Sequence, residues 1–182
     1  MIVLDCESKL LAAQVPGKWN SIHLMGLACA VVYDFDTERF TCYDHTQREA
    51  LCARLLAADK IVSFNGDRFD YPLVFELVMR APPTEIVPKS VDLYRLMCVG
   101  ANRNPALPQK GFGLGATAQR TIGRTKIDTG THAPQLYAEG KWGELFTYCM
   151  DDVALTRDLY LHVRKHGYVV GPKGEQIAVR LA

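Results

Sequence analysis

Two acidic residues separated by one position follow the apolar run that opens the chain. Asp5 and Glu7 come directly after Met1-Ile2-Val3-Leu4. Because a strand directs alternate side chains to opposite faces, these two carboxylates point the same way, a few ångströms apart. Like charges held this close need a cation, and hard oxygen ligands suit Mg²⁺ or Mn²⁺. The pattern favours metal-assisted phosphoryl chemistry, and two ordinary surface acids at a solvated strand end are the alternative.

A second chemical pair lies in a late segment with helical apolar spacing. Tyr148 and Asp152 stand four residues apart and therefore share one helix face, one turn from each other. The same face carries Leu145, Cys149, Leu155, Leu159 and Val163. Burying a carboxylate in such a stripe is costly unless it is compensated, so we expect Asp152 to have a cation partner. Asp151 falls on a polar face and is expected to be in solvent. The alternative for Asp152 is a hydrogen-bonded helix residue at the edge of the core. The alternative for Tyr148 is a half-buried side chain whose hydroxyl contacts water.

A third acidic position follows the apolar run 61–64, in Asn65-Gly66-Asp67-Arg68-Phe69-Asp70. Asp67 and Asp70 compete for a functional role. Asp70 could be a first-turn helix residue stabilised by the backbone dipole, because Pro72 marks the first turn, and Asp67 could be a turn or cap residue. We expect such a structural role for whichever acid is not in a site.

The charge distribution is more informative than the net charge of +1, which argues against a bulk electrostatic nucleic-acid binder. The segment 93–127 contains no Asp or Glu and carries Arg95, Arg103, Lys110, Arg120, Arg124 and Lys126. It is a candidate phosphate-contacting surface, and an ordinary basic loop is the alternative.

The sequence predicts mainly strands in the first part of the chain and mainly helices in the later part, and these elements must position the residues above. Strands are expected at 1–4, 23–33, 39–43 and 61–64, and turn residues at 34–37 favour an antiparallel meander. Helices are expected at about 47–57, after residue 67 with Leu73, Val74, Leu77 and Val78, weakly at 114–122, and most strongly at 143–165. A short element spans 91–97, and a Gly/Pro/Asn-rich connector spans 100–113. The order predicts an α/β fold with a mixed sheet, antiparallel meander plus parallel strands, flanked by helices.

Composition is compatible with a compact enzyme. At 182 residues and 48% hydrophobic, the chain can form one domain with a sizeable core. We expect this domain at 1–166 and a small β-hairpin appendage at 167–182. The six cysteines include no C-x-x-C pair and are interpreted as buried reduced thiols. A core strand at Met1 leaves no room for a signal peptide, and no apolar stretch is long enough to span a bilayer, so a cytoplasmic protein with no membrane contact is expected.

Taken in order, the motifs are D-x-E on the first strand, N-x-x-x-F-D after a later strand, and Y-x-x-x-D on a late helix. In this the chain resembles the DEDD superfamily of 3′-to-5′ exonucleases, in the DEDDy branch whose third motif carries a tyrosine and whose fold is ribonuclease H-like. The matching residues are Asp5, Glu7, Asp70, Tyr148 and Asp152, within a resemblance that spans residues 1–163. Softer similarities to predicted stand-alone members are Asp92 in Val91-Asp92-Leu93 and the segment 112–128, which ends in a glycine and Lys-x-Asp.

The resemblance implies a two-metal-ion site with Mg²⁺ or Mn²⁺. Asp5, Glu7 and Asp152 would bind one ion that carries the attacking water, and Asp5 would also reach a second ion. Asp70 would ligate that second ion directly or through water. Tyr148 would orient the water, since its ordinary pKa makes it a poor base.

The implied activity is hydrolysis of phosphodiester bonds at the 3′ end of single-stranded or frayed nucleic acid, DNA favoured over RNA, with release of nucleoside monophosphates. A polymerase, helicase or recombination partner could act in trans, as in DNA repair. The candidate substrate-binding residues are Asn65, Phe69, Arg103, Lys110, Arg120, Arg124 and Lys126. Phe64 and Phe69 could stack on a terminal base, with core packing as the alternative. Two other functions stay open: a non-catalytic ribonuclease H-like module that binds nucleic acid or a partner, and a structure-specific endonuclease with the same metal site.

Overall fold

The structure is a computed structural model, and it describes residues 1–126 and 132–181. Asp128, the acid of the Lys-x-Asp similarity, lies outside these described residues. Within them, five strands form one sheet in the order β3-β2-β1-β4-β5. Their bounds are β1 (Ile2–Ser8), β2 (Leu27–Asp34), β3 (Arg39–Asp44), β4 (Ile61–Ser63) and β5 (Ser90–Asp92).

Helices connect the strands and follow them. The α-helices are α1 (Arg48–Ala57), α2 (Asp70–Val74), α3 (Leu93–Gly100), α4 (Leu114–Ile122), α5 (Ala133–Ala138) and α6 (Trp142–His166). Short 3-10 turns span Ala12–Gln14, Lys18–Asn20, Ile22–Leu24, His45–Gln47 and Val87–Lys89. In the described part of the chain, no helix combines the length and apolar character that crossing a bilayer requires.

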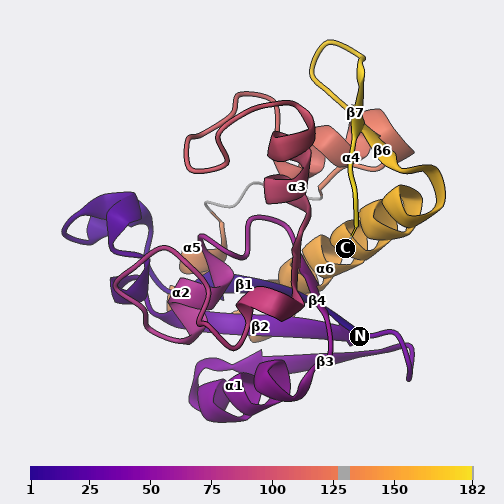
Figure 1. The fold of residues 1–182 in the computed structure, drawn as a ribbon. Helices are drawn as coiled ribbons and strands as arrows, with labels where there is room; N and C mark the ends of the chain where they lie inside the picture. Colours follow the sequence, from indigo (N-terminus) through magenta and orange to yellow (C-terminus); the bar gives the residue numbers. More distant parts are fainter. Residues whose placement is uncertain (127–131, 182) are drawn as a thin grey trace.

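The sheet is mixed, which confirms the predicted fold class. β2 pairs antiparallel with β1 and with β3, whereas β4 pairs parallel with β1 and with β5. Figure 1 shows α1 against one face of this sheet and α6 across the other. The molecule is therefore an α/β layer structure with β1 at its centre.

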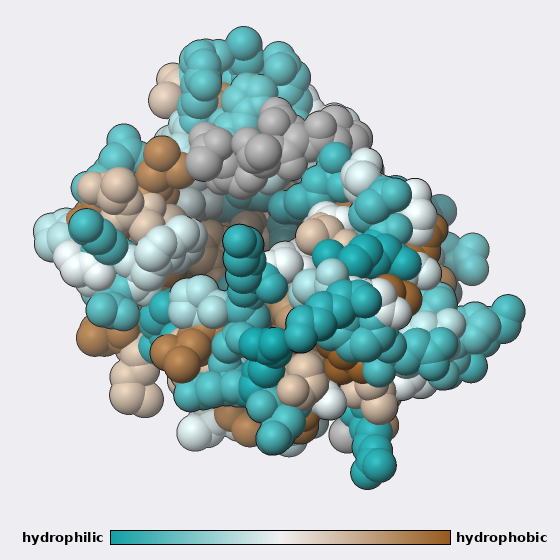
Figure 2. Space-filling view, turned by 90° about the horizontal axis from the view of Figure 1, so that it is seen from above, coloured by the Kyte–Doolittle hydropathy of each residue, from teal (hydrophilic) through white to brown (hydrophobic). Residues whose placement is uncertain are grey.

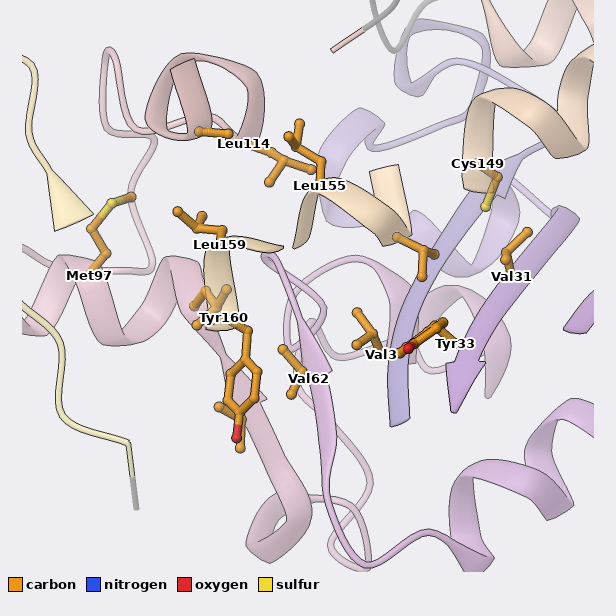
Figure 3. Packing of buried hydrophobic residues seen from close by; sticks show 14 of the residues in the cluster. Val3, Val31, Tyr33, Val62, Met97, Leu114, Cys149, Leu155, Leu159 and Tyr160 are labelled. Atoms are coloured by element: carbon orange, nitrogen blue, oxygen red, sulfur yellow. The ribbon is translucent and has the colours of Figure 1, made fainter. Parts of the chain in front are cut away.

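Alternation along β1 divides the core into two layers. Ile2 and Leu4 pack in the same cluster as the buried leucines of α1. Val3 points to the opposite face and joins a cluster with Leu155 and Leu159 of α6 (Figure 3). Because the period of a strand is two, Asp5 and Glu7 continue the face of Val3 and point toward α6.

Two elements differ from the sequence prediction for backbone reasons. The strand expected from residue 23 begins at Leu27, because Ile22–Leu24 forms a 3-10 turn and Gly26 takes a left-handed conformation with φ 68°. The helix expected to include Leu77 and Val78 ends at Val74, and Glu76 soon after it has φ 52°. A left-handed residue cannot continue a right-handed helix, so this prediction was wrong beyond Val74.

β6 (Tyr168–Val170) and β7 (Gln176–Ala178) pair antiparallel as a second, two-stranded sheet. The guanidinium of Arg120 donates from Nε to the carbonyl of Val170 at 3.1 Å and from Nη2 to that of Gly111 at 2.6 Å. A Cβ at Gly100 would lie 1.9 Å from the carbonyl oxygen of Ala178, so only glycine allows the end of α3 to approach β7 this closely.

Candidate active site

The site lies at the edge of the sheet where three parallel strands end. Asp5 and Glu7 occupy the carboxyl-terminal half of β1, Asp70 opens α2 after β4, and Asp92 is the last residue of β5. Parallel strands present their carboxyl ends at one edge, where open α/β sheets bind their ligands. β4 pairs with β1 only at Ile2 and Val3, so the strand beyond Val3 is not covered by β4.

Helix α6 brings its own residues to the same edge. Cys149 donates from Sγ to the backbone carbonyl of Asp5 at 3.3 Å, and the same sulfur lies 3.7 Å from Oδ2 of Asp5. One potential ligand atom from each of Asp5, Glu7 and Cys149 lies within 4.8 Å of the others. Tyr148 and Asp152, on the same helix, are both buried. The D-x-E and Y-x-x-x-D motifs therefore meet across the interface between β1 and α6.

The negative charges of the carboxylates raise one another's pKa values. The pKa of Asp5 is raised well above its ordinary value, first by burial and then by the negative charges of Asp152, Asp70 and Glu7. Burial also raises the pKa of Glu7, followed by the charge of Asp152. Like charges in a poorly solvated site disfavour ionisation. The four acids thus form one carboxylate cluster, defined as Asp5, Glu7, Asp70 and Asp152.

Asp70 is buried, whereas Asp67 three residues before it is partly exposed. Burial raises its pKa to about 7, the charge of Asp92 adds to that effect, and a hydrogen bond from the Cys6 thiol opposes it. Its Oδ1 atom and Oδ1 of Asp152 are both buried with no hydrogen-bond partner among the described residues. Buried carboxylate oxygens without partners are costly, and a divalent cation with oxygen ligands would satisfy them. The donor set therefore fits a hard metal ion.

Among the described residues, Lys126 is a cation that contacts the carboxylate cluster. Its Nζ lies 2.5 Å from Oδ2 of Asp152, and the two side chains are 26% and 4% exposed. The same ammonium donates to the Tyr148 hydroxyl at 3.5 Å. Its stem rests on Gly115 of α4, where an added Cβ would lie 2.9 Å from Cγ of the lysine. The expected cation partner of Asp152 is thus present as a lysine.

Asp92 holds the loop that precedes Asp70. Its carboxylate accepts from the backbone N–H groups of Asn65 at 2.8 Å, Asp67 at 3.1 Å and Arg95 at 3.2 Å. Asn65 adopts φ 68°, and a Cβ at the next residue, Gly66, would lie 2.4 Å from Oγ of Ser63 and 3.2 Å from Oδ2 of Asp70. The carboxylate of Asp92 thus fixes a tight turn packed against Asp70.

Asp67 and Asp151 have structural contacts. Asp67 accepts from Nε of Arg95 at 2.6 Å and from the Ser90 hydroxyl at 2.6 Å, as expected for the acid that is not in the cluster. Asp151 pairs with Arg124 at 3.7 Å and its side chain is only 16% exposed. The prediction that Asp151 faces solvent was therefore wrong, because α4 and the residues after it cover that side of α6.

A cleft of about 570 Å³ opens beside the carboxylate cluster. Asp5, Asp152 and Lys126 line it together with Asn65. Three aromatic side chains contribute to the lining: Trp19, Phe64 and Tyr94. Two arginines, Arg68 and Arg80, and the connector residues 105–109 complete much of the wall. The face of the molecule seen in Figure 2 is hollowed near its centre, with hydrophilic side chains around much of the rim.

Of the candidate substrate-binding residues, Asn65 and Lys126 line this cleft, and Phe69, Arg103, Lys110, Arg120 and Arg124 do not. The ring of Phe69 packs against that of Trp19, with centroids 6.4 Å apart. Arg120 binds backbone carbonyls as described, Arg124 forms ion pairs with Asp151 and Asp158, and Arg103 donates to Gln109 at 3.2 Å. Lys110 is exposed.

Sequence reasoning did not identify Trp19, Arg68, Arg80 or Tyr94 as cleft residues. Arg68 lies inside the second motif and could have been noticed there. Trp19 lies in the irregular segment between β1 and β2, where no periodicity predicts the direction of a side chain.

The comparisons with known proteins agree with this architecture. A family model described as the RNase_H superfamily matches residues 4–164, which include every member of the carboxylate cluster. A search of curated proteins found no significant match. The strand order, the position of the acids at the ends of β1 and β4, and the match over most of its length lead to one conclusion: this chain belongs to the RNase_H superfamily.

Proposed function

We propose that this protein is a metal-dependent 3′-to-5′ exonuclease that acts on single-stranded or frayed ends, with DNA favoured over RNA. The proposal depends on one observation above all: four carboxylates and a tyrosine from distant parts of the sequence converge beside a cleft with aromatic and basic walls. Membership of the RNase_H superfamily makes a nuclease-type phosphodiester hydrolase the expected class of activity.

The carboxylate cluster would hold Mg²⁺ or Mn²⁺ through Asp5, Glu7, Asp70 and Asp152. When bound, the ions would supply the Lewis acidity that activates water and stabilises the charge on the leaving oxygen. The oxygens of Asp70 and Asp152 without partners are the feature of this chain that fits such ions.

The role of Tyr148 follows from its surroundings. Burial and the nearby charge of Glu7 raise the pKa of its hydroxyl above its ordinary value of 10.0, so the phenol stays protonated at neutral pH. A neutral phenol is a hydrogen-bonding group and not a general base. Tyr148 would therefore orient the attacking water, and Lys126 beside it would help to neutralise the phosphate that enters.

The first test is a nuclease assay on 5′-labelled single-stranded DNA and RNA. With Mg²⁺ or Mn²⁺ we expect a ladder that shortens from the 3′ end, and EDTA should abolish it. Asp5→Asn and Asp152→Asn should each lower the rate at least about 100-fold, because each removes a metal ligand. Asp151→Asn, one position away on α6, is the matched control and should retain activity.

The same assay separates the alternatives. A covalently closed circular substrate should stay intact, and its cleavage would indicate an endonuclease instead. Tight nucleic-acid binding with no product under any divalent metal would favour the non-catalytic binding module. Degradation that persists in EDTA would exclude the proposed mechanism altogether.

A further inference from the structure

Arg68 and Arg80 form a pair of like charges in the cleft wall. Arg68 lies in the loop between β4 and α2, and Arg80 follows α2 in the chain. Nε of Arg80 donates to the backbone carbonyl of Arg68 at 3.2 Å, and this hydrogen bond holds the Arg80 side chain against Arg68. Both line the cleft and both are half-buried. Burial, followed by the positive charge of Arg68, lowers the pKa of Arg80.

Within the described ranges, neither guanidinium forms an ion pair. Five other arginines contact a carboxylate, namely Arg48, Arg54, Arg95, Arg124 and Arg157, whereas Arg120 has backbone carbonyls as its partners. Holding two half-buried positive charges together without a counter-ion is unfavourable. An anion would relieve this repulsion, and a planar guanidinium suits phosphate oxygens in particular.

The rest of the cleft restricts what that anion is. The carboxylates of Asp5 and Asp152 line the same cleft and repel a small free anion. Trp19, Phe64 and Tyr94 present aromatic surfaces, and Trp19 is 57% exposed. Proteins bind single-stranded nucleic acid in grooves that combine aromatic faces with positive groups.

We propose that Arg68 and Arg80 together bind one backbone phosphate of a single strand, at a linkage on the 5′ side of the bond that the carboxylate cluster faces. This inference rests on the proposed function for the direction of the strand. It assigns to Arg68 and Arg80 the phosphate contact that the sequence suggested for Arg103, Lys110, Arg120 and Arg124.

The test measures binding without catalysis, so that it does not depend on nuclease activity. A 5′-fluorescein oligodeoxynucleotide in EDTA is titrated with wild type, Arg68→Gln, Arg80→Gln or the double variant, and its fluorescence anisotropy is measured. Arg164→Gln, an exposed arginine near the end of α6, is the matched control. We expect each cleft variant to raise Kd about fivefold or more. The slope of log Kd against log salt should fall by about 0.7 in the double variant, as for one lost phosphate contact on a single strand.

A second measurement locates the phosphate, and its wild-type series does not depend on whether a variant folds. Single methylphosphonate linkages, which carry no charge, are placed at successive positions from the 3′ end. One position should weaken wild-type binding, and the same position should have no further effect in the double variant.

Either of two results would overturn the inference: variants that bind with the wild-type Kd and salt slope, or wild-type binding that no single neutral linkage weakens. If the wild type fails to cleave any substrate but shows these binding results, the proposed function fails while the phosphate site stands. If the wild type cleaves but these binding effects are absent, only the inferred phosphate site is contradicted and the proposed function stands.

Discussion

At the scale of single residues, Lys126 is the group whose environment is most informative. Its ammonium contacts Asp152 and Tyr148, and its charge lowers the pKa of Glu7 against the opposing effect of burial. A lysine in this position balances charge that a divalent ion would otherwise balance. Its partly exposed location keeps the desolvation cost of the ion pair moderate, since one end of the side chain borders the cleft.

Substituting methionine for Lys126 keeps most of the apolar stem and removes the charge. In EDTA, Lys126→Met should lower the free energy of unfolding by about 1–3 kcal/mol, because Asp152 is left buried with an unpaired charge. Mg²⁺ should recover part of this loss, since a bound cation replaces the missing one. Urea denaturation with and without Mg²⁺ measures both effects. The exposed Lys110→Met is the control, and equal stability of wild type and Lys126→Met in EDTA would contradict the expectation.

At the scale of elements, the turn between β4 and α2 connects the cluster to the rest of the sheet. The carboxylate of Asp92, at the end of β5, accepts hydrogen bonds from this turn and from the first turn of α3. Asp70 begins α2 on the other side of the turn. A single buried side chain thus sets the relative positions of two helices and one member of the carboxylate cluster.

Gly66→Ala tests how tightly this turn is packed. The new Cβ would lie 2.4 Å from Oγ and 2.6 Å from Cβ of Ser63, so the turn must move, and Asp70 with it. We expect a loss of about 1–3 kcal/mol in stability and weaker Mn²⁺ binding. Gly143→Ala is the matched control, because a Cβ there meets nothing within 4 Å. Urea denaturation and calorimetric metal titration provide the two readouts, and unchanged Mn²⁺ affinity in Gly66→Ala would argue against the coupling.

The parts of the site that sequence could predict are those fixed by local periodicity. Alternation on β1 gives the common direction of Asp5 and Glu7, and the four-residue spacing gives the common face of Tyr148 and Asp152. The early end of α2 could not be predicted, because it depends on a left-handed Glu76. The pairing of Arg68 with Arg80 also depends on how the chain returns after α2, which is a tertiary property.

At the scale of the whole molecule, buried acids link stability to pH. Burial raises the pKa of Asp70 to about 7 and that of Asp92 to about 6, from an ordinary value of 3.8. Between the ordinary pKa and these raised pKa values, the folded protein therefore binds more protons than the unfolded chain. Stability falls with rising pH wherever the folded state holds the extra protons.

We therefore expect the metal-free protein to lose at least about 1 kcal/mol of stability between pH 5 and pH 8. Mg²⁺ should reduce this loss, because it binds the ionised carboxylates that appear at the higher pH. Urea denaturation in EDTA and in Mg²⁺, at one-unit pH intervals, measures both trends. A metal-free protein that becomes steadily more stable from pH 5 to pH 8 would contradict the raised pKa values of Asp70 and Asp92.

The contact between Asp5 and Cys149 joins residues 144 positions apart. During synthesis, the acids of β1 therefore cannot meet those of α6 until the chain as far as Asp152 has left the ribosome. Domains acquire their tertiary contacts as units during synthesis. The carboxylate cluster consequently assembles only after α6 has been synthesised and has packed against β1.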